Sequence, residues 1–119
     1  MVPLAPGYLV LDLMAEMSLG VLIVARLGLG TINHTLLTVY ACRERGLKVV
    51  GVVLNGCHSV KGDLAAQTNP AVIAEVGDVP VLAVIPYDIG TCVEEGRLGN
   101  QTIQTISQVD WAGLTPSNQ

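Results

Sequence analysis

The chain has 119 residues, of which half are hydrophobic and 13% are charged, with a formal net charge of −4. This composition excludes a disordered tail, and the lack of any Lys or Arg cluster argues against nucleic-acid binding through phosphate neutralisation. With no Phe, one Trp and three Tyr, the core is expected to be aliphatic. The length suits one small domain.

The cysteine pattern indicates a cytoplasmic protein. Cys42, Cys57 and Cys92 are odd in number and widely spaced, with no CxxC pair, and the two histidines complete no metal-ligand pattern. Reduced thiols are therefore expected. The longest apolar stretches are shorter than the ~20 residues that span a bilayer. The first residues, 1–7, lack the basic region of a secretory signal.

Three short apolar runs, each rich in β-branched residues and nearly continuous, predict the strands of a sheet. They are Val21–Ala25, Val49–Leu54 and Val81–Ile85. Continuous apolar runs of this length are typical of parallel strands that are covered on both faces.

Helical segments are expected around these strands, at Tyr8–Met17, Asn33–Arg45, Asn69–Val76 and Asn100–Val109. Gly46 is expected to end the second helix, and Asn69 to cap the third, with Pro70 at its first helical position. The order predicts a three-layer α/β domain around a parallel sheet, with right-handed crossovers.

The domain is expected to span residues 1–110, followed by a loose tail over 111–119. Two polar, glycine-containing stretches, Gly56–Thr68 and Gly90–Gly99, are expected to be surface loops. The second includes Arg97, which we interpret as part of a solvated charged turn, and the first includes Cys57 and His58, interpreted as loop residues.

The segment from Ala25 to Thr35 leaves a predicted strand, passes Gly28 and Gly30, and enters a predicted helix. Such a turn directs backbone N–H groups and a helix dipole at one spot, which favours phosphate or carboxylate. Neither Gly-Lys-Ser/Thr nor the third glycine of a dinucleotide fingerprint is present. The pattern alone also allows an ordinary strand-to-helix turn with Thr31 or Asn33 as N-cap.

A longer stretch carries a family resemblance. The run VARLGLGTINHTLLTVYACRERGLKVVGVVLNG resembles the middle of dethiobiotin synthases, around their Gly-x-x-Asn-His motif. The segments YLVLDLMAEM and NPAVIAEVGDVPVLAVIPY also match, in the same order, so the resemblance covers about residues 2–88. It implies the C-terminal half of a P-loop NTPase-like α/β fold, with about three strands kept.

The resemblance implies an ATP-dependent cyclo-ligase of biotin biosynthesis that closes a ureido ring. In this family diaminopelargonate is carboxylated by CO₂, ATP with Mg²⁺ phosphorylates the carbamate, and the second amine displaces phosphate. By this resemblance Gly30, Thr31, Ile32 and Asn33 would hold the tail carboxylate of diaminopelargonate. In the family this turn reaches across a two-fold interface into the partner's active site.

The resemblance also implies a nucleotide-binding role for two strand ends. Asn55 would hydrogen-bond the adenine of ATP, and Pro86 and Tyr87 would line the adenine pocket. Without the resemblance, Asn55 reads equally as a turn residue and Pro86-Tyr87 as an ordinary strand exit. His34 is interpreted as a structural residue at the helix start, and no catalytic residue or metal ligand is assigned.

The family's phosphoryl-transfer residues have no counterpart in this sequence. It contains neither the P-loop with its lysine nor the Glu-Gly-Ala-Gly-Gly segment that supplies a Mg²⁺ ligand. Phosphoryl transfer depends on positioning and charge stabilisation by those groups. We therefore expect the chain to act in a homo-oligomer or with a separate P-loop-bearing chain. The alternative is a non-catalytic ligand-binding or scaffolding module derived from the family.

Overall fold

A computed structural model describes residues 2–56 and 64–114, apart from the side chains of 64–66. The elements in chain order are β1 (Pro3–Ala5), β2 (Tyr8–Leu9), α1 (Val10–Met17), β3 (Val21–Leu27), α2 (Thr31–Glu44), β4 (Val49–Gly56), α3 (Leu64–Gly77), β5 (Val81–Ile85), α4 (Asn100–Ser107) and α5 (Trp111–Leu114). No helix in these ranges is long and apolar enough to cross a membrane.

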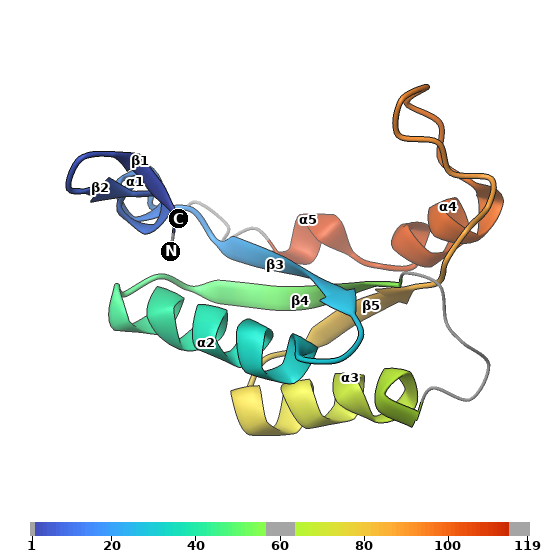
Figure 1. Cartoon of the computed structure of the whole chain (residues 1–119), viewed down its shortest axis with the longest axis horizontal. Coiled ribbons are helices and arrows are strands. Elements are labelled where there is room, and N and C mark those ends of the chain that lie inside the picture. The colour runs from blue at the N-terminus through green and yellow to red at the C-terminus, as the bar shows by residue number, and fades with distance from the viewer. Residues whose placement is uncertain (1, 57–63, 115–119) are drawn as a thin grey trace.

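A three-stranded parallel sheet, in the order β3-β4-β5, forms the centre of the molecule. Helices α2 and α3 lie on one face of it, and α4 and α5 lie on the other (Figure 1). The predicted three-layer α/β architecture with three parallel strands is therefore confirmed. The bounds of β5 agree with the prediction, whereas β3 and β4 each extend two residues further.

The prediction that each strand is covered on both faces holds for β4 and is wrong for β3. Four consecutive residues of the middle strand, 51–54, are buried. In β3, by contrast, Val21 and Ile23 are buried while Leu22 and Val24 are exposed, Val24 by 63%. The alternation arises because α2 covers one face of this edge strand, whereas on the other face α4 packs against β5.

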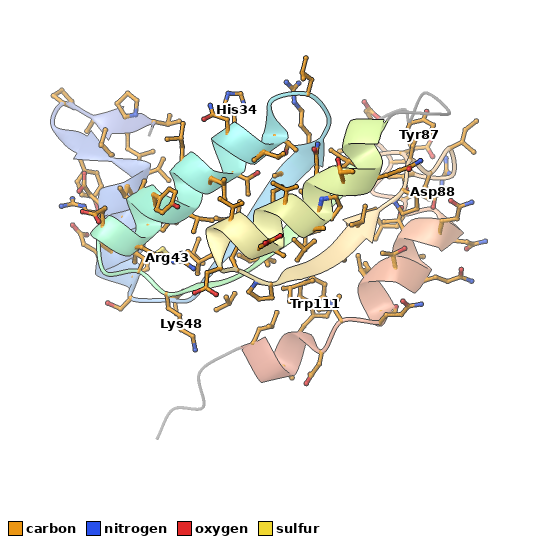
Figure 2. The ribbon with its side chains drawn as sticks, turned by 90° about the horizontal axis from the view of Figure 1, so that it is seen from below. His34, Arg43, Lys48, Tyr87, Asp88 and Trp111 are labelled. Atoms are coloured by element: carbon orange, nitrogen blue, oxygen red, sulfur yellow. The ribbon has the colours of Figure 1, made fainter. Side chains whose placement is uncertain are left out.

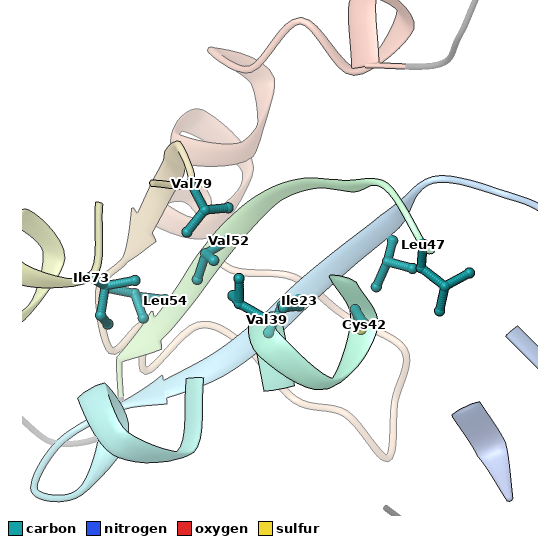
Figure 3. Packing of buried hydrophobic residues seen from close by; sticks show 9 residues of the cluster. Ile23, Val39, Cys42, Leu47, Val52, Leu54, Ile73 and Val79 are labelled. Atoms are coloured by element: carbon teal, nitrogen blue, oxygen red, sulfur yellow. The ribbon is translucent and has the colours of Figure 1, made fainter. Parts of the chain in front are cut away.

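The core lies between the sheet and helices α2 and α3, and it is aliphatic as predicted. Its fully buried side chains include Val39 of α2, Ile73 of α3, and Val52 and Leu54 of β4. These side chains point toward one another across the layer (Figure 3). Cys42 fills the same layer as a small apolar residue and is 1% exposed.

The N-terminal segment differs from the expected helix over Tyr8–Met17. Strands β1 and β2 form a short antiparallel hairpin, and α1 starts only at Val10. The Asp12 carboxylate accepts a hydrogen bond of 2.8 Å from the N–H of Leu9, which is extended at φ −101°. This bond caps the helix there, and Asp12 also pairs with Arg45 just after α2.

The start of α3 was predicted wrongly. The helix begins at Leu64, so Asn69 and Pro70 lie inside it rather than at its N-terminus. The expected loop Gly56–Thr68 is accordingly wrong at both ends, since Gly56 closes β4; Cys57 and His58 lie outside the described residues.

The other helix ends are closer to expectation. Helix α2 begins two residues earlier than predicted, and Gly46 follows its C-cap residue with a φ of 73°, as the predicted helix end requires. Gly90–Gly99 lies outside helices and strands, as predicted, with one bridge between Cys92 and Arg97. The expected loose tail contains α5, and residues 115–119 lie outside the described ranges.

Candidate functional site

The carboxyl ends of the three strands meet at one edge of the sheet. Asn55, near the end of β4, is in register with Arg26 of β3 on one side and Ile85 of β5 on the other. Its side chain is exposed, as are Pro86 and Tyr87, which follow β5 directly. Ligands of open α/β sheets bind at such an edge.

Gly56 shows how closely β4 approaches the segment after β5. A Cβ atom at Gly56 would lie 2.6 Å from the Ile85 carbonyl oxygen and 3.3 Å from the Tyr87 backbone nitrogen. A side chain at this position would therefore force the two backbones apart. The structure thus places Asn55 beside Pro86 and Tyr87. Tyr87 lies near Asp88, at the opposite end of the molecule from Lys48 (Figure 2).

The turn after β3 starts α2 through a glycine rather than through a side-chain cap. Gly30 is the N-cap residue, with φ 84° and no side-chain hydrogen bond. The interpretation of Thr31 or Asn33 as N-cap is therefore wrong, because the turn needs the left-handed conformation that glycine adopts easily. Thr31 is 3% exposed, and its hydroxyl lies 3.5 Å from that of Thr35.

Two backbone N–H groups in the first turn of α2 have no hydrogen-bond acceptor among the described residues, whereas their neighbours do. The N–H of Thr31 donates to the Gly28 carbonyl at 3.2 Å, and that of His34 donates to the Gly30 carbonyl at 3.1 Å. Within the described residues, the N–H groups of Ile32 and Asn33 have no acceptor. Together with the exposed Asn33 amide and the helix dipole, these donors favour a carboxylate or another anion.

Ile32 contributes to this turn only through its backbone. Its side chain is half-buried and packs against the aliphatic core. It therefore anchors the first turn of α2 to the sheet, while Asn33, next in the chain, is exposed. Of the four residues predicted for the carboxylate, Asn33 alone offers an exposed polar side chain.

A hollow of about 240 Å³ lies beside the turn, against the edge strand β3. Its walls are formed by Ile23, Val24, Ala25, Arg26, Thr31, His34, Thr35 and Thr38. Arg26 is exposed, and its guanidinium has no partner among the described residues, so it adds positive charge to the wall of this hollow. Sequence reasoning missed Arg26; its only signal was a charge that follows directly on an apolar run.

A second overlooked residue, Asp88, organises the loop after Tyr87. Its carboxylate accepts hydrogen bonds of 2.9 Å each from the N–H groups of Thr102 and Gly90. The bond from Thr102, with the one from Gly90, holds the pKa of Asp88 below its ordinary value despite partial desolvation. The N-terminus of α4 is thus occupied by a carboxylate of the chain itself (Figure 2).

The same loop is closed by three further contacts. The N–H of Gly99 donates to the Thr91 hydroxyl at 2.9 Å. Arg97 donates to the Gly90 carbonyl and pairs with Glu95, and both charged side chains are more than half exposed. The interpretation of Arg97 as a residue of a charged surface turn is therefore confirmed.

The described residues do not fit a metal site. They contain no group of three or more His, Cys, Asp or Glu side chains that could hold an ion. Cys42 is not suited to nucleophilic chemistry, because burial raises the pKa of its thiol. The strand-end edge carries the Asn55 amide, the backbone N–H groups of Ile32 and Asn33, and the Tyr87 ring.

A three-stranded parallel sheet with helices on both faces is the architecture of a fragment of a P-loop NTPase-like fold. The sequence model of the AAA domain family matches residues 1–92. The chain is 46% identical over 99 residues to the ATP-dependent dethiobiotin synthetase of Thermodesulfovibrio yellowstonii, covering 83% of this chain and 40% of that protein.

Relatives from Bacillus agree. The chain is 46% identical over 85 residues to the ATP-dependent dethiobiotin synthetase of Bacillus velezensis and 47% identical over 85 residues to that of Bacillus licheniformis. In both cases the match covers 71% of this chain and 36% of the relative. The chain belongs to the dethiobiotin synthetase family, and it spans 36–40% of the length of these relatives.

Proposed function

We propose that this chain supplies the ligand-recognition part of a dethiobiotin synthetase of biotin biosynthesis. In this proposal Asn55, Pro86 and Tyr87 receive the adenine of ATP, and the turn Gly30–Asn33 receives the tail carboxylate of diaminopelargonate. The observation that carries it is the meeting of these groups at one edge of the sheet, with Asn55 beside the end of β5. The relatives are ATP-dependent dethiobiotin synthetases, which supports the choice of ATP as a ligand.

The chemistry of each group suits its proposed ligand. The Asn55 amide offers both a donor and an acceptor, the pair that the edge of adenine requires, and Tyr87 offers a ring on which a base can stack. The N–H groups of Ile32 and Asn33 are donors of the kind that bind carboxylates. Both interactions hold the reactants in place, and positioning is a large part of catalysis in ring closure and phosphoryl transfer.

The proposed reaction needs groups that the described residues do not offer. The described residues contain no group of three or more His, Cys, Asp or Glu side chains that could hold a metal ion, and we assign no phosphoryl-transfer step to them. We propose that a P-loop-bearing polypeptide, or further copies of the chain, completes the active site. The exposed Leu22 and Val24 on edge strand β3 support this, since an edge strand with apolar side chains is a surface that another element covers.

Titration calorimetry with ATP–Mg²⁺ and with diaminopelargonate, in separate experiments, tests the two sites. We expect both ligands to bind the chain, with Asn55→Ala weakening ATP about 10-fold and leaving diaminopelargonate unaffected, because the lost hydrogen bonds are worth ~1–1.5 kcal/mol. Asn33→Ala should show the opposite pattern. Each variant is thereby the matched control for the other.

Two results of the titrations would reject the proposal. If neither ligand binds the unaltered chain at millimolar concentration, the chain has no recognition sites of its own. If both substitutions weaken both ligands equally, the assignment of the two ends of the site is wrong. A P-loop-bearing part of a relative, added to the chain, should restore dethiobiotin formation if the proposal is correct.

A further inference from the structure

Asn69 is a buried polar residue in the interior of α3. The residue is 5% exposed and lies in the interior of the 14-residue helix α3. Asparagine is a poor helix former, and a buried amide without a partner destabilises a fold by ~1–3 kcal/mol. Neither helix formation nor apolar packing therefore explains an asparagine at this position, and its hydrogen-bond partner becomes the informative feature.

That partner is the turn after β3. The Nδ2 amide of Asn69 donates to the Gly28 carbonyl oxygen, with a distance of 3.4 Å. The same oxygen accepts the N–H of Thr31 at 3.2 Å, the bond that closes the turn into α2. The Gly28 carbonyl oxygen thus accepts one hydrogen bond from the start of α2 and one from α3. Helix α3 packs alongside α2 (Figure 1).

The turn has few other restraints. Gly28 and Gly30 lower the stiffness of the backbone, and Gly30 caps α2 without any side-chain hydrogen bond. A flexible turn would lose conformational entropy when it closes on a ligand, and that loss weakens binding. A side chain from the neighbouring helix that fixes the Gly28 carbonyl reduces this loss before the ligand arrives.

We propose that Asn69 is a positioning residue for the anion-binding turn. Acting through Gly28, it orients the N–H groups of Ile32 and Asn33 toward the ligand without touching the ligand itself. As a consequence, the register of α3 against α2 sets the geometry of the turn. This inference rests on the proposed carboxylate role of the turn, but its structural part can be tested without any ligand.

The first test is amide hydrogen exchange in the free protein. Asn69→Leu keeps the γ-branched shape of the side chain and removes the donor. We expect the Thr31 N–H to exchange about 5-fold faster, as loss of ~1 kcal/mol of local stabilisation implies, while the Val39 N–H in the middle of α2 is unchanged. Glu75→Gln, at an exposed position of the same helix, is the matched control and should alter neither amide.

A second variant separates positioning from packing. Asn69→Asp is nearly isosteric, but its carboxylate cannot donate to the Gly28 carbonyl until it is protonated. Protection of the Thr31 N–H relative to that of Val39 should therefore recover in Asn69→Asp as the pH falls through the titration of the new carboxyl. Asn69→Leu should show no recovery.

The ligand-dependent readout follows from the same variants. We expect Asn69→Leu to weaken diaminopelargonate about 5-fold and to leave ATP unaffected. Unchanged Thr31 exchange in both variants, or equal loss of both ligands, would overturn the inference. If the unaltered chain binds no diaminopelargonate, the proposed function fails, and the exchange data still decide whether Asn69 orders the turn.

Discussion

Gly56 is the residue at which two parts of the proposed nucleotide site come closest. It ends β4 directly after Asn55, and the backbone of Ile85 to Tyr87 lies where its side chain would be. The obstacle is backbone rather than the end of a flexible side chain, so it cannot rotate away. A requirement for glycine at this position therefore arises from packing and not from a turn conformation.

We expect Gly56→Ala to lower the free energy of unfolding by roughly 1–3 kcal/mol, as overpacking of a tight site does. Urea denaturation followed by circular dichroism measures this. Gly28→Ala is the control, because a Cβ atom at Gly28 meets no other atom within 4 Å. The control should change the free energy of unfolding by less than about 1 kcal/mol. Equal destabilisation by the two substitutions would contradict the close approach.

At the scale of an element, the Asp88 carboxylate caps the N-terminus of α4. Above the ordinary pKa of an aspartate, the charged carboxylate accepts from Thr102 and Gly90 and stabilises the loop and the helix start. The pKa of Asp88 is lowered by folding, so this stabilisation is fully present above the unfolded-state pKa. It disappears as the pH falls through the lower, folded-state pKa.

We expect Asp88→Asn to have a lower melting temperature than the unaltered chain at pH 7, because a neutral amide is the weaker acceptor. The difference should begin to shrink as the pH falls below about 4, the ordinary pKa of an aspartate, and should vanish once the pH lies below the lowered pKa of the native carboxyl. Thermal denaturation between pH 3 and pH 7 measures both effects. Glu75→Gln removes an exposed charge from α3 and should show no such convergence. A constant difference at all pH values would exclude the capping role.

The elements also show what sequence patterns can and cannot predict. The run Val81–Ile85 was predicted with its observed bounds because a parallel strand between polar turns has a local signal. The start of α3 had no such signal. Asn69-Pro70 has the chemistry of a helix start, but α3 begins at Leu64 and the buried amide of Asn69 bonds the turn after β3. That contact joins residues 41 positions apart and has no local signature.

The residues of the candidate site also differ in whether local sequence or tertiary contacts reveal them. The positions of Asn55 and Pro86 at strand ends follow from the pattern of strands, and their proposed roles follow from the family motif. Asp88 and Arg26 escaped notice because their meaning depends on tertiary neighbours: the start of α4 for Asp88, the turn after β3 for Arg26. Local sequence indicates where a ligand edge lies, and packing decides which side chains organise it.

At the scale of the whole molecule, edge strand β3 leaves one face of the sheet incompletely covered. Val24 and Leu22 lie on the sheet face opposite α2, and Leu19 just before the strand is 62% exposed. The strand is also an edge of the sheet, so its outer backbone groups are open to pairing. Apolar side chains and open backbone groups together predict that this face associates with another polypeptide.

We expect the chain by itself to associate through this face at micromolar concentration, and Val24→Thr to weaken the association about 10-fold. Threonine keeps the β-branched shape and replaces a methyl group by a hydroxyl, and burial of a valine side chain is worth ~1.5–3 kcal/mol. Sedimentation velocity over a concentration series measures the shift. Val93→Thr makes the same replacement at a position that is 84% exposed in the loop after β5, and it should leave the association unchanged. A monodisperse monomer of the unaltered chain, or equal effects of the two substitutions, would show that β3 is not the contact surface.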